Sequence, residues 1–312
     1  MAYFLGVDGG GTKTEFLLGD DQRELGRVRS GSIKRLRLDH ETAALNLRNA
    51  LDELTAITGV SMIEVDRCCV GTPGVAVPLM VEWISEQFGA LVGGELLLVG
   101  DVEVAHDAAF FAKRGILILA GTGSQIVGRD ANGKIVTAGG WGPALSDEGS
   151  GHFLGVEGLR RAFRAIDEER PTILLEVMQR HWQLGSIGEL VQFANTNPAP
   201  DFSQLAPLVA GCAAGGDEVA LEVIRHGAEE LTLLASLVME RIRGAELAGS
   251  DGSAQGDFVL PPIALAGSIL EKVAVERRAV EERLRLAYPG VTILDAVAEP
   301  VQGALWRARR GG

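Results

Sequence analysis

The first part of the chain consists of short apolar runs separated by glycine-rich or polar turns. Apolar residues 3–5 lead into the turn 6–14 and residues 15–18 lead out of it, which predicts two paired strands. Residues 24–28 are expected to form a third antiparallel strand. Apolar positions then recur at helical spacing and predict a helix over 40–58. This order of three strands and a helix is the first indication of an α/β unit.

Further apolar runs continue this unit. We expect a buried strand at 66–70, a helix at 83–88 and a second buried strand at 95–99. A helix over 102–112 follows directly after Asp101. Strands that alternate with helices in this way favour a partly parallel sheet.

The opening pattern returns in the middle of the chain. A strand at 116–119, a Gly/Thr turn at 120–124, and strands at 125–128 and 134–138 repeat the first plan in the same order. A duplicated unit predicts two similar α/β domains that face one another. We expect the two Gly/Thr turns to hold one polyphosphate from opposite sides.

The remainder of the chain is predicted to be mainly helical. The elements we expect are long helices within 152–244 with a break at 195–200, a mobile loop at 249–256, a strand at 262–266 followed by a helix, a last strand at 291–294 and a final helix at 301–309.

The first turn carries candidate chemistry. Consecutive glycines at 9–11 leave backbone N–H groups uncovered, and Thr12 and Lys13 add a hydroxyl and a positive charge, so we interpret the turn as a phosphate-binding hairpin. Asp8 is placed to hold a divalent metal. A Walker A loop is excluded because Thr12 stands where its lysine belongs and a strand follows. A dinucleotide fingerprint fails because Thr14 replaces its last glycine. An ordinary glycine-rich hairpin stays the alternative.

The composition of the chain limits the kinds of partner and ligand that it is expected to bind. The 312 residues carry a formal net charge of −13, which argues against nucleic acid or an anionic membrane as the main partner. Cys68, Cys69 and Cys212 have no zinc spacing and are interpreted as buried thiols of a cytoplasmic protein. No apolar run reaches membrane-spanning length and no signal peptide is evident. We expect none of the five histidines to bind a metal.

Five segments taken together resemble the BadF/BadG/BcrA/BcrD ATPase family, and within it the N-acetylglucosamine and glucosamine kinases. They are GVDGGGTKT at 6–14, the lone Asp101, AGTGS at 120–124, GGWGPALSDEGSG at 139–151 and LAGSI at 265–269. The resemblance covers nearly the whole chain.

The resemblance implies an α/β fold of two duplicated ribonuclease-H-like domains with an ATP and sugar cleft between them, as in actin-like ATPases. We expect an N-terminal domain at 1–113 and a C-terminal domain with helical insertions at 114–300. Residues 301–312 would form a helix that returns to the first domain.

The implied activity is ATP-dependent phosphorylation of a hydroxyl group on an amino-sugar such as N-acetylglucosamine or glucosamine, with Mg2+ and in a homodimer. The residues that match the family's nucleotide-binding segments are Gly10, Gly11, Thr12 and Lys13 in the first turn, Gly121, Thr122, Gly123 and Ser124 in the second, and Gly267 and Ser268 in the adenosine segment. The alternative for the last pair is a helix cap.

Asp101 matches the family's catalytic base. Phosphoryl transfer to a sugar needs a carboxylate that accepts the hydroxyl proton, and a residue at the end of a strand is well placed for it. The alternative role for Asp101 is to cap the next helix. Asp107 is the competing base, but it is expected to lie inside that helix with a structural role.

Thr72, Trp141, Gly142 and Asp147 match the sugar-binding positions. An indole offers a flat apolar face to a pyranose ring, and a carboxylate accepts hydrogen bonds from sugar hydroxyls. The alternative is a core tryptophan and a loop aspartate. The loop at 30–34 lacks the asparagine of relatives that act on N-acetylglucosamine, and its Lys34 favours a more anionic substrate.

Two other functions compete with a kinase. An ATPase activator of a radical dehydratase or aryl-CoA reductase would hold an iron–sulfur cluster through cysteines, and the three cysteines do not fall where a cluster needs them. A non-catalytic sugar sensor would have no need of Asp8, Lys13 and Asp101.

Overall fold

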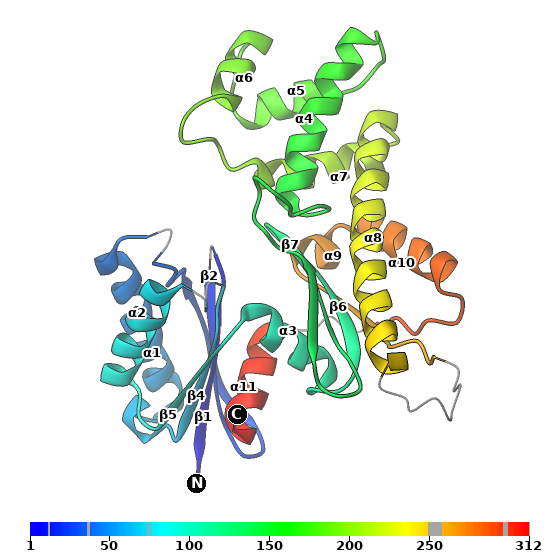
Figure 1. Cartoon of the computed structure of the whole chain (residues 1–312). Helices are drawn as coiled ribbons and strands as arrows, with labels where there is room; N and C mark the ends of the chain where they lie inside the picture. The colour runs from blue at the N-terminus through cyan, green and yellow to red at the C-terminus, as the bar shows by residue number, and fades with distance from the viewer. Residues whose placement is uncertain are drawn as a thin grey trace. The chain divides into compact units, whose positions relative to one another are not determined.

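A computed structural model describes the chain except for residues 12, 36–37, 74, 76, 249–257, 296–298 and 312. The chain divides into two compact units, one made of residues 1–113 with 298–312 and the other of residues 114–297. Each unit has its own β-sheet and its own helices, as Figure 1 shows.

The sheet of the first unit combines a three-stranded meander with two parallel strands. Its order is β3-β2-β1-β4-β5, with β1 antiparallel to β2, β2 antiparallel to β3, and β1, β4 and β5 parallel. The strands are β1 (Tyr3–Gly9), β2 (Lys13–Asp20), β3 (Glu24–Gly31), β4 (Arg67–Gly71) and β5 (Glu95–Val99). All five predicted strands of this region are confirmed.

Helices cover both faces of this sheet. They are α1 (His40–Thr58), the short helix η1 (Met62–Glu64), α2 (Pro78–Leu91), α3 (Asp101–Phe110) and α11 (Pro300–Arg310). Successive residues of β1 point to opposite faces, so Leu5 packs with α1 and α2 while Phe4 packs with α3 and α11. Gly6 permits this close packing, because a Cβ there would lie 2.4 Å from the backbone nitrogen of Leu305 in α11.

The sheet of the second unit repeats the plan with one strand fewer. Its order is β8-β7-β6-β9, with β6 antiparallel to β7, β7 antiparallel to β8, and β6 parallel to β9. The strands are β6 (Gly115–Ala120), β7 (Ser124–Arg129), β8 (Ile135–Gly139) and β9 (Ile263–Ala266). The duplication expected from the sequence is therefore present, and the α/β fold class is confirmed.

One apolar core joins this sheet to the helices of the second unit. These helices are α4 (Gly151–Asp167), α5 (Leu174–His181), α6 (Ile187–Ala194), η2 (Phe202–Leu205), α7 (Ala206–Ala214), α8 (Glu218–Ala248), α9 (Ser268–Lys272) and α10 (Ala274–Ala287). The predicted break at 195–200 lies between α6 and η2.

Two predictions for the second unit are not confirmed. The predicted strand at 291–294 is wrong, since Ile293 makes one isolated bridge to Ile263 and no ladder follows. A four-residue apolar run is too short to distinguish a strand from an extended segment that fills the core. The predicted mobile loop at 249–256 lies outside the described residues.

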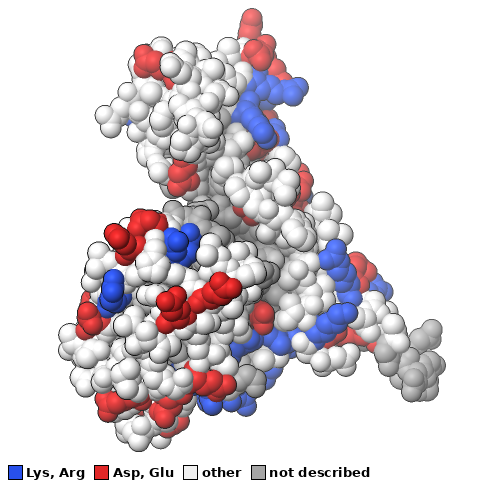
Figure 2. Space-filling model, turned by 60° about the vertical axis from the view of Figure 1, so that its left-hand side comes forward, with Lys and Arg blue, Asp and Glu red and all other residues white. Residues whose placement is uncertain are grey.

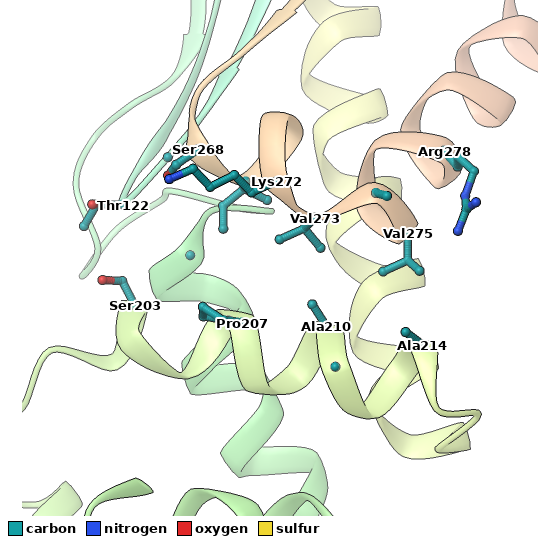
Figure 3. Close-up of a pocket in the computed structure, with 15 residues that line it drawn as sticks. Thr122, Ser203, Pro207, Ala210, Ala214, Ser268, Lys272, Val273, Val275 and Arg278 are labelled. Atoms are coloured by element: carbon teal, nitrogen blue, oxygen red, sulfur yellow. The ribbon is translucent and has the colours of Figure 1, made fainter.

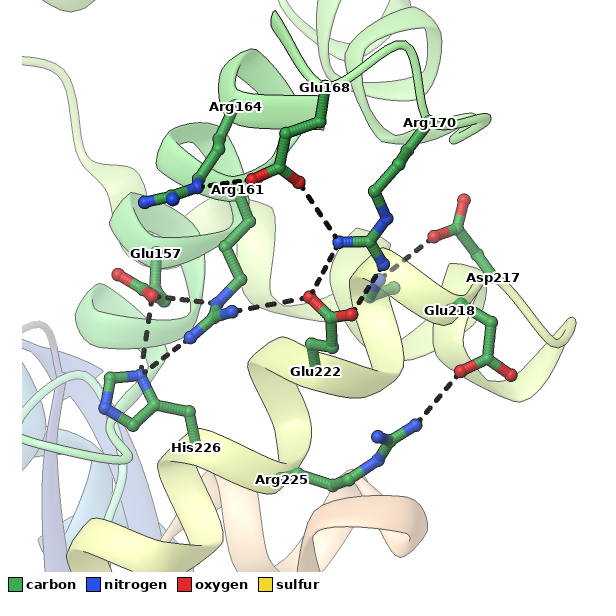
Figure 4. A network of polar contacts seen from close by, with 11 residues as sticks. Glu157, Arg161, Arg164, Glu168, Arg170, Asp217, Glu218, Glu222, Arg225 and His226 are labelled. Carbon is green, nitrogen blue, oxygen red and sulfur yellow. Dashed lines mark hydrogen bonds and ion pairs between the residues drawn. The ribbon is translucent and has the colours of Figure 1, made fainter. Parts of the chain in front are cut away.

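A polar network connects α4 with α8, as Figure 4 shows. The Arg170 guanidinium lies 2.5 Å from a Glu222 carboxylate oxygen, and the Arg161 guanidinium reaches the same carboxylate at 3.4 Å. Partly exposed ion pairs of this kind each contribute little to the free energy of unfolding.

Charged side chains of both signs mix over the surface. Figure 2 shows Lys and Arg interleaved with Asp and Glu over the face in view. Within the described part of the chain, no helix is long and apolar enough to cross a membrane.

Glu276 is a buried carboxyl group in the second unit. It lies on α10 with no exposed surface, and neither carboxyl oxygen has a hydrogen-bond partner among the described residues. A Cβ at Gly227 of α8 would lie only 2.7 Å from Glu276 Oε1, so the glycine leaves the space that the carboxyl group fills. Burial raises the pKa of Glu276 well above its usual range.

We predict that Glu276→Gln makes the stability of the protein less dependent on pH. The folded state holds the Glu276 proton at pH values where the unfolded chain releases it. Stability is therefore lost as pH rises above about 4.3, by up to about 1.4 kcal/mol per pH unit for one proton. Thermal unfolding should be measured between pH 5 and 8. The midpoint temperature of Glu276→Gln should rise relative to that of the wild type as pH increases.

Glu282→Gln is the matched control, because Glu282 lies on the same helix with its side chain exposed. It should leave the wild-type pH profile unchanged. If the pH profile of Glu276→Gln also matched the wild type, the carboxyl group would not be held neutral.

Candidate active site

Three predicted site residues lie at one edge of the first sheet, where its parallel strands end. Asp8 is the second-last residue of β1, Thr72 directly follows β4, and Asp101 comes shortly after β5. The Thr72 hydroxyl donates to the carbonyl oxygen of Gly9 at 3.3 Å, and its backbone N–H donates to the carbonyl oxygen of Val99 at 3.1 Å. Thr72 therefore ties the three strand ends together, at the edge where α/β sheets bind ligands.

Asp101 is the first residue of α3. Gly100 occupies the cap position and no side chain caps this helix, so the alternative role of Asp101 as the cap residue is wrong. Burial raises the pKa of the Asp101 carboxyl group, while hydrogen bonding to the Val102 amide and the positive charge of Lys34 oppose the shift. The result is a partly buried carboxylate with a raised pKa, which suits a general base that acts near neutral pH.

Asp8 has the more strongly shifted carboxyl group. Burial, the negative charge of Asp101 and that of Glu15 raise the pKa of Asp8 to about 7, against an opposing effect of Lys13. A magnesium ion fits these residues, because carboxylate oxygens are its preferred protein ligands and a cation would relieve the repulsion between Asp8 and Asp101. Among the described residues, no three acidic, His or Cys side chains gather as a metal site.

The first Gly/Thr turn connects β1 to β2. The carbonyl oxygen of Gly10 accepts a hydrogen bond from the Ser32 hydroxyl at 2.9 Å, which anchors the turn to the loop after β3. Gly11 lies in the turn, and Thr12 lies outside the described residues. Lys13 extends into solvent and pairs with Glu15 at 3.0 Å.

Thr14 also carries a hydroxyl next to this turn, but it is fully buried in β2. Its side-chain oxygen accepts a hydrogen bond from the backbone of Ile33 at 3.2 Å. Thr14 therefore does not face the turn, and its hydroxyl serves the packing of the sheet against the following loop.

Asp107, the competing base, has a structural position as expected. It is fully buried inside α3, and Arg307 of α11 donates to it from Nε at 2.7 Å and lies 2.5 Å away through Nη2. Arg307 also reaches Glu103 at 3.2 Å. A carboxylate held this way by a guanidinium is not available to take a proton from a substrate.

The second Gly/Thr turn connects β6 to β7 and is held by the start of α4. The backbone N–H groups of Gly151 and His152 donate to the carbonyl oxygens of Gly121 and Thr122, at 2.8 and 3.2 Å. Ser124 is buried at the start of β7, where its hydroxyl donates to the carbonyl oxygen of Glu148 at 2.7 Å. The turn is thus fixed on both sides by the segment 139–151.

Gly267 lies between β9 and α9 with φ +93°. A Cβ there would lie 2.4 Å from the carbonyl oxygen of Ala120, so only glycine fits this close approach to the second turn. Gly267 is also the cap residue of α9, and Ser268 is the first residue inside the helix. The Ser268 hydroxyl therefore does not cap α9.

A pocket of about 630 Å³ brings the second turn and the adenosine segment together within the second unit. Gly121, Thr122 and Ser268 line one end of it, as Figure 3 shows for the two hydroxyl residues. The small residues Ala210 and Ala214 of α7 form one wall. A volume of this size is typical of small-molecule sites.

The predicted sugar residues of the segment 139–151 differ in exposure. Trp141 is 76% exposed, so its alternative role as a core tryptophan is wrong. Gly142 has φ +91° beside it in the same loop. Asp147 is 7% exposed, and its Oδ1 accepts a hydrogen bond from the Ser124 backbone at 3.3 Å. Asp147 thus supports the second turn directly, and a Cβ at Gly123 would meet it at 2.8 Å.

The pocket also contains residues that the sequence interpretation missed. Lys272 and Arg278 line it from α9 and α10, and Ser203 lines it from η2. Lys272 could have been found, because it follows Ser268 by four residues in a predicted helix and so shares its face. Ser203 and Arg278 gave no such signal, since they reach the pocket only through the packing of α7 and α10.

The cysteines are free and buried, as expected. Burial raises the pKa of the Cys68 thiol well above its usual value and that of Cys69 to about 12. Cys212 is also buried, in helix α7, where burial raises the pKa of its thiol. None of the three is in a position to ligate a surface cluster.

Comparison with known proteins places these features in a family. The model of the BadF/BadG/BcrA/BcrD ATPase family matches residues 5–308. The chain is 26% identical to the N-acetylmuramic acid/N-acetylglucosamine kinase of Clostridium acetobutylicum, over 99% of both chains. It is 28% identical to the N-acetyl-D-glucosamine kinase of Dictyostelium discoideum, over 96% of both.

A solved structure shares the fold. A protein of Chromobacterium violaceum, provisionally assigned as an N-acetylglucosamine kinase, superimposes with a TM-score of 0.73 at 23% identity, over 98% of both chains. The family match spans both units and every segment on which the resemblance rests. The chain therefore belongs to the BadF/BadG/BcrA/BcrD ATPase family.

Proposed function

We propose that this protein is an ATP-dependent kinase that phosphorylates a hydroxyl group of an amino-sugar. The observation that carries the proposal is the position of Asp101, a partly buried carboxylate with a raised pKa that follows a parallel strand beside Asp8 and Thr72. Family membership supports the use of ATP, and two of the relatives are named as kinases of N-acetylglucosamine, one of them also of N-acetylmuramic acid.

In the proposed reaction, Asp101 accepts the proton of the sugar hydroxyl as its oxygen attacks the terminal phosphorus of ATP. The products are ADP, the sugar phosphate and one proton. Mg2+, held by Asp8 and by phosphate oxygens, would neutralise charge on the transferred phosphoryl group. The raised pKa of Asp101 strengthens it as a base, while the positive charge of Lys34 lowers that pKa and so favours the ionised form that accepts the proton.

We assign nucleotide binding to two sets of residues. The pocket that contains Gly121, Thr122 and Ser268 is proposed to take the nucleoside, with Gly123, Ser124 and Gly267 holding its walls. The backbone of Gly10 and Gly11, with Thr12 and Lys13, is proposed to contact the phosphates, because a bare turn exposes its N–H groups to an anion.

The sugar is proposed to lie against Thr72, Trp141, Gly142 and Asp147. The exposed Trp141 indole is a flat apolar surface of the kind that pyranose rings contact. The positive charge of Lys34 is close enough to Asp101 to lower the pKa of that group, which supports an acidic amino-sugar as one accepted substrate. The resemblance supports a homodimer, and the free buried thiols support a reducing cytoplasm.

The two competing functions lack support of this kind. An activator of a radical enzyme needs cysteines at a cluster, and all three cysteines are buried in β4 and α7. A sugar sensor needs no base, whereas Asp101 has both the position and the raised pKa that a base requires.

The proposal is tested by measuring ATP consumption with a panel of sugars. The panel contains glucose, glucosamine, N-acetylglucosamine and N-acetylmuramic acid, each with and without Mg2+. We expect sugar-dependent release of ADP and formation of a sugar phosphate for at least one amino-sugar, and none without Mg2+. ADP release at the same rate with and without every sugar would contradict the kinase and favour an ATPase.

A further inference from the structure

The nucleotide pocket of the second unit has an unusual charge. Among the described residues that line it there is no acidic side chain, although the chain as a whole has 42 acidic and 29 basic residues. Lys272 and Arg278 are the charged residues of this lining. The pocket is therefore locally positive in an acidic protein, which favours an anionic ligand.

Both cations are without ionic partners among the residues that the structure describes. Within the described part of the chain, neither Lys272 nor Arg278 makes a hydrogen bond or an ion pair through its side chain, and both residues are exposed. Their neighbours on α10 behave differently, since Arg277 pairs with Glu281 at 2.8 Å and Arg285 with the same carboxylate at 3.3 Å. Lys272 and Arg278 can therefore bind a ligand without first breaking an internal pair.

The two side chains lie at different ends of the pocket. Figure 3 shows the Lys272 side chain extending along α9 toward Ser268, on the side of the pocket where Thr122 lies. Arg278 lies beside Val275 at the opposite end, with Ala210 and Ala214 on the wall between the two ends. The cation at the end of the pocket with the Gly/Thr turn is thus Lys272, and apolar side chains line the stretch between the two ends.

We propose that Lys272 binds the phosphate next to the ribose of the bound nucleotide. An ammonium group four residues after Ser268 on the same helix face reaches the ligand where the ribose gives way to phosphate. It would supply a positive charge there that the glycine-rich turn cannot. Arg278, at the opposite end, would contact the base and be indifferent to the number of phosphates. This inference rests on the proposed function, because it takes the pocket to be the nucleotide site.

Calorimetric titration of the full chain with adenosine, AMP, ADP and ATP tests the inference without a sugar or a catalytic step. Lys272→Met should weaken the binding of AMP, ADP and ATP by about 10-fold or more, which is the usual effect of losing a charge-assisted hydrogen bond. It should weaken the binding of adenosine by less than about 2-fold. Arg278→Met is the matched control, because it removes the same charge from the same pocket. It should change all four affinities by one common factor. Lys272→Arg should restore most of the AMP affinity.

The outcomes separate the two levels of the argument. The role of Lys272 is overturned if the wild type binds AMP and Lys272→Met binds it with equal affinity. It is also overturned if the substitution lowers the affinities for adenosine and AMP by the same factor. In both cases the kinase proposal stands. If the wild type binds none of the four compounds, the nucleotide site itself is overturned, and with it both proposals.

Discussion

Asp101→Asn is expected to lower the rate of sugar phosphorylation by about 10²- to 10⁴-fold, the usual contribution of a general base. The substitution keeps the size of the side chain and removes its ability to accept a proton. Because Asp101 is the first residue of α3 and not its cap, the helix should form normally. Steady-state kinetics with the best sugar of the panel measures the effect, which should fall on kcat, while ATP binding by calorimetry should stay within about 2-fold of the wild type.

Glu95→Gln is the control for this experiment. It makes the same chemical change at the first residue of β5, the strand that ends just before Asp101, where Glu95 pairs with Arg67 at 2.8 Å on the surface. It should leave kcat unchanged. Equal turnover by wild type and Asp101→Asn would remove Asp101 from the role of base, and another group would have to accept the proton of the sugar hydroxyl.

Arg307→Met is expected to destabilise the first unit by about 3–5 kcal/mol, the usual cost of leaving a buried charge without its partner. Asp107 has no exposed surface, and the Arg307 guanidinium lies against it at 2.5 Å. Burial would lower the pKa of Arg307, but the negative charges of Asp107 and Glu103 raise it, so the guanidinium stays charged in place. Urea unfolding followed by tryptophan fluorescence measures the loss.

Two further variants define the cause of that loss. Arg310→Met changes the same helix at an exposed position, where Arg310 lies 5.2 Å from the centre of the Trp306 ring, and should cost less than about 1 kcal/mol. The double variant Asp107→Leu with Arg307→Met removes both charges and should recover part of the stability. If Arg307→Met were no less stable than Arg310→Met, the pair would not hold α11 against α3.

The local elements of this fold could be predicted from the sequence because their signals are periodic. The helix 40–58 has apolar residues at helical spacing and coincides with α1, and the strand 95–99 coincides with β5. The duplicated strand–turn–strand plan was visible because glycine and threonine mark both turns. The strand expected at 291–294 failed because Ile293 contributes to the core through a single bridge, which no local pattern encodes.

The candidate site was predictable in its parts and not in its assembly. The sequence indicated Asp101 by its place after a strand, but only the fold shows that Thr72 joins the ends of three strands around it. In the same way, Ser268 was indicated by its motif, whereas Arg278 reaches the pocket through the packing of α10 near α7. Contacts between residues distant in sequence depend on tertiary structure, which local spacing does not specify.

The return of α11 to the first unit has a consequence for how the protein is made. The first unit contains residues on both sides of the second unit in sequence, and α11 supplies much of the core beneath β1 and α3. A ribosome must therefore synthesise the whole second unit before the first can complete its core. Until then, α3 alone covers that apolar face of the first sheet, and partly exposed apolar surface of this kind is a binding site for chaperones.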